Sequence, residues 1–542
     1  MPWLDMRCCT LHCLQSLLAG LLLIAEPVLS ASNGGAWVLT EADLQPARML
    51  LEEQPLPVIL SRDQGIAEER ATRPPIVAPL EVGQWLNQKY ESGLVAGNVG
   101  DLYENRDSGH SRLRLSYFPQ LTPVEYRLSA PERLPLTGVQ TRVVHPRPTI
   151  GNASLAVTAG MPPRSLPRML FHNTPYGPTQ YLLYRANQIY LYPEHRDHDD
   201  VDHFALNTPY LLITQGSSGS DRPFLQAIAA TLAAFKPEVK IRLTEEGMLM
   251  PVLQYLLRSS YRTNEGDYFN GISHPTVFNI DHLDVSRMVH DAFALRGDSL
   301  PPLAMLKVLK EPSEESGVSS FDAGLSEELL TTPCAIARLA RGKAGSLTYR
   351  LSALKSFDLN EKPLTYQWKI LRGNPESIHI RPLLSDHSIV EITIDYPDAP
   401  TLANPESFRI DIGLFASNEA HSSPPAFFSV YFPPNQTRSF DSSGKLLAID
   451  YQNHRSTRFD PTLFPHKPWK DTYVYAEGGT LKGWTRESAN GATHRFNADG
   501  ELLAPEASWK SAGQAVRYNR TWSDEKWTVT YDAVSTGTAS HH

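Results

Sequence analysis

The densest group of side chains able to do chemistry lies between residues 195 and 203, where three histidines, four aspartates and Arg196 fall within nine residues. Carboxylates this close repel one another unless a cation or an arginine lies between them, so the group is either metal-bound or solvated. The candidate metal ligands are His195, Asp197, His198 and Asp199, and Asp197 is also a candidate catalytic acid or base. Imidazole and carboxylate donors together suit a divalent cation such as Ca, Zn or Mn.

The spacing of this cluster fits no standard metal motif. Val201 occupies the fifth position of a would-be EF-hand loop, and Asp202 occupies the sixth, which that loop reserves for glycine. The cluster also lacks the His-Glu-x-x-His pattern of a zinc helix. A solvated acidic loop therefore remains the alternative.

A second polar segment, residues 215–221, follows a short apolar strand at 210–214 and precedes a helical run that ends near Phe235. Its N–H groups and the helix N-terminus could hold an anion or a developing oxyanion. Ser218 is the candidate nucleophile, and His274, in a loop marked by Gly and Pro, is the candidate base. The candidate substrate-binding residues are Gln215, Ser217, Ser220 and Asp221.

This turn departs from the G-x-S-x-G nucleophile elbow, because its second glycine comes one place early. A capping turn without chemistry is the alternative. A third polar segment, residues 97–111, offers Asp101, Asn105, Asp107 and His110 to a hard cation. Its alternative is a turn in which Asn and Asp bond their own backbone.

Composition sets the class of protein. A chain of 542 residues predicts several domains, and 41% hydrophobic with 20% charged residues is a globular composition. The formal net charge of -9 argues against a nucleic-acid partner, which would call for a basic surface. We expect no organic cofactor, and the sequence gives no indication of oligomeric state.

The first 30 residues have the pattern of a secretory signal peptide. Arg7 precedes an apolar run at 14–24, and cleavage is expected near Ser30–Ala31. The run is short for a membrane span, although a retained signal anchor is the alternative. No later stretch has 18 apolar residues, so we expect a secreted or periplasmic mature chain without a membrane span. Cys334 is then the one cysteine left, which predicts a small buried residue without a disulfide.

The polar segments need elements to hold them. Residues 31–90 predict a partly ordered leader arm with one helix at 42–53. Residues 91–310 predict an α+β or α/β functional domain. Its expected strands are 182–192, 210–214 and 302–309, and its expected helices include 237–246, 251–259 and 284–295. A Ser- and Glu-rich stretch at 311–333 predicts a linker.

Residues 334–435 predict a β-sandwich, with strands at 347–354, 364–371, 388–394, 408–415 and 425–432. Residues 356–368 read SFDLNEKPLTYQW and resemble a signature of PKD-type immunoglobulin-like domains. Residues 410–418 resemble the later V-x-V-x-A-x-D-N strand of that family, with Leu414 and Ser417 departing from it. The resemblance implies that Trp368 is the core tryptophan and that the domain is an extracellular spacer or binding module.

Residues 436–542 repeat an aromatic-x-x-x-Gly-x-Leu motif three times, beginning at Phe440, Tyr475 and Phe496. The motif is similar to the YD repeats of Rhs-type surface proteins, each a β-hairpin with glycine at the turn. Because the intervals of 35 and 21 residues differ, we expect a small antiparallel hairpin sheet. Four tryptophans there, Trp484, Trp509, Trp522 and Trp527, could form a sugar-stacking face, with core packing as the alternative.

Together these features predict a secreted multidomain hydrolase acting on an extracellular polymer or glycan, with a metal ion as a candidate aid. Residues 95–330 also resemble a group of secreted bacterial proteins, which implies a localisation and no chemistry. The alternative is a non-catalytic surface protein for binding or adhesion. The enzyme hypothesis requires residues 101–110, 195–203, 215–221 and His274 to meet in one cleft.

Overall fold

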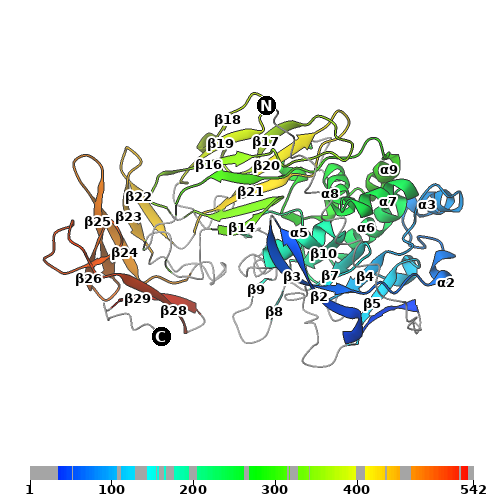
Figure 1. Ribbon diagram of the computed structural model, residues 1–542, viewed down its shortest axis with the longest axis horizontal. Coiled ribbons are helices and arrows are strands. Elements are labelled where there is room, and N and C mark those ends of the chain that lie inside the picture. The colour runs from blue at the N-terminus through cyan, green and yellow to red at the C-terminus, as the bar shows by residue number, and fades with distance from the viewer. Residues whose placement is uncertain are drawn as a thin grey trace, which may run out of the picture.

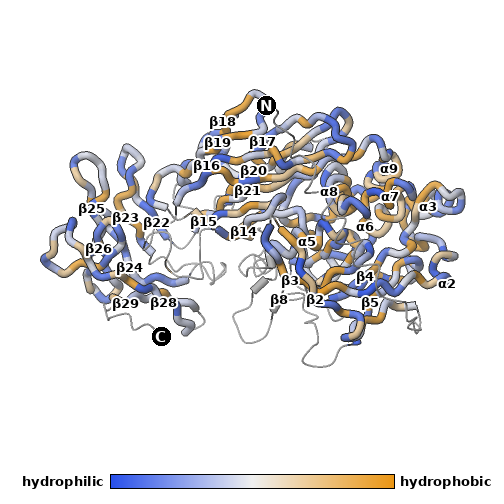
Figure 2. Tube along the Cα trace, in the orientation of Figure 1, coloured by the Kyte–Doolittle hydropathy of each residue, from blue (hydrophilic) through white to orange (hydrophobic). Residues whose placement is uncertain are grey.

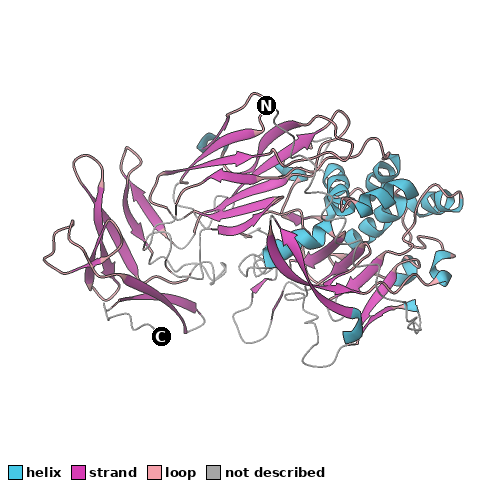
Figure 3. Ribbon diagram, viewed as in Figure 1, coloured by secondary structure: helices cyan, strands magenta, loops and turns pink. Residues whose placement is uncertain are grey.

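The protein is multidomain and rich in strands in the computed structural model (Figures 1 and 3). The structure describes residues 35–51, 53–106, 111–127, 143–153, 156–157, 164–165, 176–194, 204–261, 268–313, 317, 321, 328–340, 342–397, 409–433, 436–451, 465–523 and 526–534. The predicted signal peptide lies outside them, and no described helix is long and apolar enough to cross a membrane.

The first unit is built on a seven-stranded sheet in the order β1-β5-β4-β7-β10-β11-β12, and every neighbouring pair in it is parallel. The strands are β1 (Trp37–Leu39), β4 (Leu102–Asn105), β5 (Thr122–Tyr126), β7 (Thr149–Asn152), β10 (Gln188–Pro193), β11 (Leu211–Thr214) and β12 (Val277–Phe278). β10 and β11 are buried along their whole length, as expected of central parallel strands. The unit is therefore α/β, and the carboxyl ends of its strands share one edge, which we call the carboxyl edge.

Helices cover this sheet, and α3, α6 and α9 pack against one another (Figure 1). The helices are α2 (Glu68–Ala71), α3 (Val82–Glu91), α5 (Tyr176–Arg185), α6 (Arg222–Ala234), α7 (Pro237–Glu245), α8 (Leu249–Ser260) and α9 (Val285–Ala294), with short 3₁₀ turns η2 (Glu41–Asp43), η3 (Leu115–Tyr117), η4 (Gly271–Ser273), η5 (Ile280–His282) and η6 (Pro375–Ser377). The helices predicted at 237–246, 251–259 and 284–295 are confirmed within a few residues.

Two elements of this unit differ from the sequence-based expectation. Residues 42–53 form no α-helix, because β2 (Leu44–Leu51) pairs with β3 (Gln54–Ser61) in a hairpin. Pro46 inside this stretch disfavours a helix, and pairing with a partner strand decides the outcome. β3 also pairs with β6 (Val143–Val144), so residues 35–90 belong to the α/β unit instead of forming a leader arm.

The single strand expected at 182–192 is the end of α5 followed by β10. Asn187 separates them with a left-handed backbone, φ 60°, a conformation that asparagine tolerates better than most residues. The strand expected at 302–309 is shorter and later, at β13 (Lys307–Lys310). A small two-stranded sheet of β8 (Ala156–Val157) and β9 (Arg164–Ser165) completes this part of the chain.

The second unit is a sandwich of two sheets, β13-β16-β19-β18 and β14-β15-β21-β20-β17. Its further strands are β14 (Glu328–Thr332), β15 (Ala335–Leu339), β16 (Ser346–Ser352), β17 (Thr365–Arg372), β18 (Ile378–Pro382), β19 (Ile389–Asp395), β20 (Arg409–Ser417) and β21 (Ala426–Tyr431). Tyr349 and Phe428, one from each sheet, pack with ring centroids 4.9 Å apart. Figure 2 shows the hydrophobic residues of β20 and β21, which are buried.

The five predicted sandwich strands are confirmed, but Trp368 is only partly buried. It lies on β17, at the edge of its sheet, and its indole N–H donates to the carbonyl of His387. Edge strands are covered by one neighbour only, which explains the exposure. Cys334 is buried as predicted, and burial raises the pKa of its thiol to about 12.

The third unit holds a six-stranded sheet, β22-β23-β24-β25-β26-β27, and a two-stranded sheet, β28-β29. The strands are β22 (Thr437–Phe440), β23 (Leu446–Asp450), β24 (Trp469–Tyr475), β25 (Leu481–Ser488), β26 (Thr493–Asn497), β27 (Leu502–Leu503), β28 (Val516–Ser523) and β29 (Lys526–Ala533). Each predicted motif is a hairpin turn: Phe440 pairs with Leu446, Tyr475 with Leu481 and Phe496 with Leu502. The turn glycines have positive φ, as such turns require.

The stretch expected to be a linker, residues 311–333, contributes described residues to the sandwich and to the third unit. β14 lies within it, and Phe321 is buried in the core of the third unit, with its ring 5.3 Å from that of Tyr518. The carbonyl of Gly317 accepts a hydrogen bond from Arg486, which is buried in the same core. The third unit is therefore assembled from the hairpin region and from residues that precede the sandwich.

Candidate functional site

The order of the strands points to one position on the parallel sheet. β5 lies beside β4 on one side, and β7, β10 and β11 follow one another on the other side. The chain therefore changes direction across the sheet between β4 and β7. Ligands of open α/β sheets bind at such a switch point, outside the carboxyl ends of the strands. Here that place is the end of β4 and β7, where Asn105 pairs with Asn152.

Polar side chains at this point join two of the predicted segments. The backbone N–H of Gly219 donates to Ser111 Oγ at 2.7 Å, and the Asn152 side chain donates to the Ser111 carbonyl. The Tyr103 hydroxyl donates to Asn152 Oδ1 at 2.9 Å. We call Tyr103, Ser111, Asn152 and the 215–221 turn the carboxyl-edge site. The segment after β4 and the segment after β11 therefore meet there.

The 215–221 turn presents exposed side chains at this edge. Gly216 and Gly219 have φ of 118° and 96°, which allows the chain to double back before α6. Ser220 shares a 2.9 Å hydrogen bond with Thr214 Oγ1 and so is held inside the turn. The candidate residues Gln215, Ser217 and Ser218 are exposed, whereas Asp221 is buried where α6 begins. Gln215, Ser217 and Ser218 are thus the accessible members of the predicted set.

The 195–203 cluster, with His195, Asp197, His198 and Asp199, lies outside the described residues, and so do Asp107 and His110. Glu194, directly before the cluster, is buried at the carboxyl edge, where its N–H donates to the Thr214 carbonyl at 2.9 Å. Phe204, directly after it, contacts the sandwich through a hydrogen bond from Arg409. Among the described residues, no group of three or more His, Cys, Asp or Glu is placed to hold a metal ion.

Two other candidates lie away from the carboxyl edge. Asp101 precedes β4 and is buried in a 2.7 Å ion pair with Lys240, which makes it a structural group. His274 precedes β12 and is buried, with its carbonyl 2.9 Å from the Asn207 side chain that donates to it. Burial, and then the charge of Arg258, lower the pKa of His274 well below its usual value.

The parallel register separates His274 from the serine turn. Thr214 is paired with Phe278, so the turn follows the carboxyl end of β11 whereas His274 precedes the amino end of β12. The structure does not bring Ser218 and His274 together. His274 instead packs its ring against Phe415 of the sandwich, with the ring centroids 5.1 Å apart.

A buried charged network is centred on Glu104, which was not among the residues predicted from the sequence. Arg106 donates two hydrogen bonds to its carboxylate, at 2.8 and 2.9 Å, and the Tyr190 and Tyr126 hydroxyls donate at 2.5 and 2.8 Å. Burial is the largest single influence and raises the pKa of Glu104, but the charge of Arg106 and the hydrogen bonds and charge of His145 and Arg106 together outweigh it. The pKa of Glu104 is therefore held well below its usual range, and the group cannot serve as a proton donor.

This network extends to a second sheet. His145 Nε2 lies 3.5 Å from Glu104, and its Nδ1 shares a 2.8 Å hydrogen bond with Ser61 of β3. All of these groups are buried, so the chain Ser61–His145–Glu104 holds the β2-β3-β6 sheet to the parallel sheet. A glutamate and an arginine two residues apart at the end of a strand share one face, and that spacing is the signal that could have revealed the pair.

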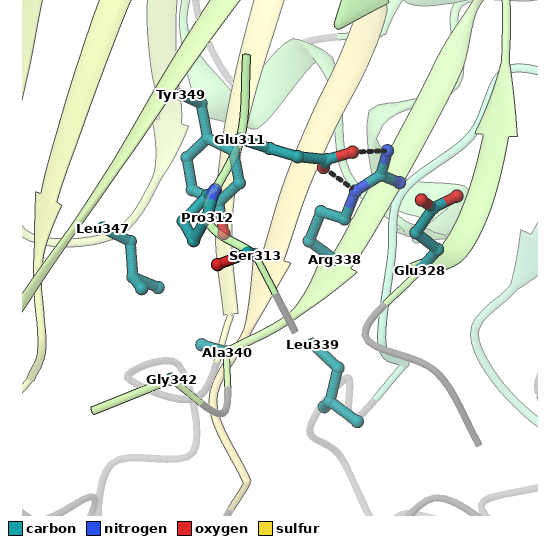
Figure 4. Close-up of a pocket in the computed structure, with 10 residues that line it drawn as sticks. All are labelled: Glu311, Pro312, Ser313, Glu328, Arg338, Leu339, Ala340, Gly342, Leu347 and Tyr349. Carbon is teal, nitrogen blue, oxygen red and sulfur yellow. Dashed lines mark hydrogen bonds and ion pairs between the residues drawn. The ribbon is translucent and has the colours of Figure 1, made fainter. Parts of the chain in front are cut away.

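A cavity of about 230 Å³ lies elsewhere, at the edge of the sandwich (Figure 4). Arg338 forms an ion pair with Glu311 at its wall, and Leu347 and Tyr349 supply apolar surface. Arg338 also donates to the Leu330 carbonyl, so its charge is already engaged. None of the site residues predicted from the sequence lines this cavity.

No protein-family model matches the chain, and no curated protein matches it. Among solved structures, it is similar to a point mutant of the SrpA adhesin from Streptococcus sanguinis, at 11% identity and a TM-score of 0.16 over 39% of this chain and 100% of that one. It is also similar to a nucleoside hydrolase-related hypothetical protein from Saccharophagus degradans associated with carbohydrate metabolism, at 9% identity and a TM-score of 0.20 over 62% of this chain and 100% of that one. TM-scores this low do not establish a shared fold.

Proposed function

We propose that the protein is a secreted hydrolase of an extracellular polymer or glycan, and that its substrate binds at the carboxyl-edge site. Asp101 and His274 lie away from this site, so the four polar segments do not all meet in one cleft, and the proposal rests on the 195–203 and 215–221 segments. The observation that carries the proposal is the contact between Gly219 and Ser111, which joins two polar segments at the switch point of a parallel sheet. The exposed Gln215, Ser217 and Ser218 offer neutral donors and acceptors, which suit the hydroxyl groups of a sugar.

The reacting groups in this proposal come from the 195–203 segment. Its first residue, His195, directly follows Glu194, which lies at the same edge. Asp197 would act as the acid or base, or it would join His195, His198 and Asp199 as a ligand of a divalent cation. When bound, such a cation polarises the scissile group or activates water.

The other two units serve as accessory modules, and the first 30 residues direct export. The PKD-like identity of the sandwich is supported by a 2.6 Å hydrogen bond from Asn418 to Asp358, which links the two stretches that carry the resemblance. The three glycine turns of the third unit support its likeness to YD repeats. Both modules then position or retain the enzyme at the polymer.

The proposal is tested by incubating the purified protein with a panel of extracellular polysaccharides and acylated polymers, with and without Mn²⁺, Zn²⁺ and Ca²⁺, and measuring released sugar or acid. We expect Asp197→Ala and His198→Ala to abolish release from the substrate that the natural protein degrades. The matched controls are Asp395→Ala and His379→Ala, exposed residues of the sandwich, which should leave release unchanged. Full activity in both Asp197→Ala and His198→Ala, or no release from any polymer, contradicts the proposal.

A non-catalytic binding protein is the second candidate, and one observation favours it. Trp522 and Trp527 are partly exposed neighbours on the β28-β29 hairpin, with ring centroids 5.3 Å apart, and the Arg520 guanidinium lies 4.6 Å from the Trp527 ring. Exposed indole rings stack on sugars. Retention on an immobilised polymer without any release of product, lost in Trp522→Ala and kept in Asp197→Ala, would favour this candidate over the hydrolase.

A further inference from the structure

Arg258 of α8 is a buried cation at the junction of the first two units. Its side chain is fully buried, and its Nε donates to Gln254 Oε1 at 3.0 Å. The guanidinium lies between the rings of Phe278, on β12, and Phe427, on β21, with each ring centroid 5.1 Å from Cζ. One ring belongs to the α/β unit and the other to the sandwich, so the cation lies between them.

The outer nitrogens of this guanidinium have no hydrogen-bond acceptor within the described part of the chain. Arg258 Nη1 and Nη2 are both buried without a hydrogen-bond partner among the described residues. The same holds for Gln254 Nε2 and the Tyr184 hydroxyl. Arg258 acts on the pKa of Tyr184, which places the phenol in the same region. Guanidinium and amide nitrogens are donors only, so this region holds several donors that lack an acceptor.

The charge of Arg258 also lacks a described counter-ion. Burial lowers the pKa of Arg258 to about 10, which leaves it positively charged at neutral pH. The groups that act on it are the phenols of Tyr268, Tyr184 and Tyr261, and burial raises the pKa of each phenol, so they carry no negative charge. His274 Nδ1, a neighbouring acceptor without a described partner, is uncharged.

A buried charge without an opposite charge is strongly unfavourable, and aromatic faces compensate it only in part. Donors that converge on a cation call for an acceptor with a negative charge. We propose that a halide ion, normally chloride, binds to Nη1 and Nη2 of Arg258 and joins α8 and β12 to β21 of the sandwich. A monatomic anion requires the least space, and the complete burial of Arg258 disfavours phosphate or sulfate.

Thermal unfolding in chloride tests this site. The natural protein is titrated from gluconate into chloride at constant ionic strength. We expect its Tm to rise and then saturate. Arg258→Met should show no saturable rise, and it should be less stable than the natural protein in chloride. In gluconate the difference in stability between the natural protein and Arg258→Met should reverse or vanish, because the substitution then removes an uncompensated buried charge.

The matched control is Arg242→Met, at the same junction of units, since Arg242 donates to the carbonyls of Gly297 and Leu359 and to Asn360. It should lose stability and keep the chloride response. Crystals of the natural protein grown in bromide should show an anomalous peak within contact of Arg258 Nη1 and Nη2, a readout that does not depend on the variant folding. A natural protein that responds to chloride no differently from Arg258→Met, or bromide crystals without that peak, would overturn the proposal.

Discussion

Glu104 and Arg106 are a buried ion pair in the α/β unit, with two hydrogen bonds between them. Removing one partner of such a pair leaves the other charge buried, away from water and without an opposite charge. We expect Glu104→Gln to lower the free energy of unfolding by about 3–5 kcal/mol, measured by urea denaturation at pH 7. The control is Glu391→Gln, a partly exposed residue of the sandwich whose partner Arg381 is exposed, where the effect should be small.

The pH dependence of the same variant has a definite sign. Because the folded-state pKa of Glu104 lies below its ordinary value of 4.5, the ionised carboxylate stabilises the fold at every pH above that value. This contribution declines as the pH falls below 4.5. The natural protein should therefore lose more free energy of unfolding on acidification than Glu104→Gln does. Equal losses in the two proteins would show that Glu104 is not held ionised.

At the scale of residues, the sequence predicted the chemical character of side chains better than it predicted their burial and their partners. Cys334 is buried as expected, because a lone cysteine behaves as a small apolar residue. Asp101 could not be distinguished from a metal ligand, since its partner Lys240 is 139 residues away in the chain. A separation of 86 residues likewise hid the contact of Glu104 with Tyr190. Polar residues reveal their type in the sequence, but long-range packing decides whether they are paired.

At the scale of elements, Gly151 sets the distance between neighbouring strands. A Cβ atom there would lie 2.5 Å from the Tyr190 ring and 2.6 Å from the Glu104 carbonyl. We expect Gly151→Ala to cost about 1–3 kcal/mol of stability, because neither the ring nor the backbone has room to move. The shift in urea midpoint measures this cost. Gly342→Ala is the control, since its nearest neighbour would be 3.9 Å away; an equal effect there would refute the steric explanation.

Local patterns predicted the elements whose own sequence decides their form. Helices α7, α8 and α9 have clear periodicity and end signals, and the hairpins of the third unit have glycine at a turn that needs positive φ. Residues 42–53 and 182–192 were wrongly predicted, because the first depends on a partner strand and the second on a left-handed Asn187. The carboxyl-edge site depends on strand order, which no local pattern contains.

At the scale of the whole molecule, the protein should unfold in two parts. One core cluster runs through the α/β unit and the sandwich, and a separate cluster forms the third unit. Phe321 belongs to the second cluster although it precedes the sandwich in the chain. We expect Phe321→Ala to cost the third unit about 3–5 kcal/mol. Calorimetry should show one of two transitions shifted downward.

The control for this experiment is Leu354→Ala, whose side chain is 60% exposed, and it should shift neither transition. A single transition, or a Phe321→Ala shift confined to the larger cluster, would contradict the division into these cores. The path of residues 311–333 could not be predicted from composition, because a Ser- and Glu-rich stretch hides the one aromatic residue that anchors it.

The central claim is that chemistry takes place at the carboxyl edge of the parallel sheet and not at its amino edge. Ser218 is exposed at the first edge. Ile272, 50% exposed in η4, lies two residues before His274, which precedes the amino end of β12. The most direct test is kcat/KM on the degraded polymer for Ser218→Trp and Ile272→Trp, since a bulky ring blocks only the edge that carries it. The account predicts a loss of about tenfold or more for Ser218→Trp and natural activity for Ile272→Trp; the opposite result would contradict it.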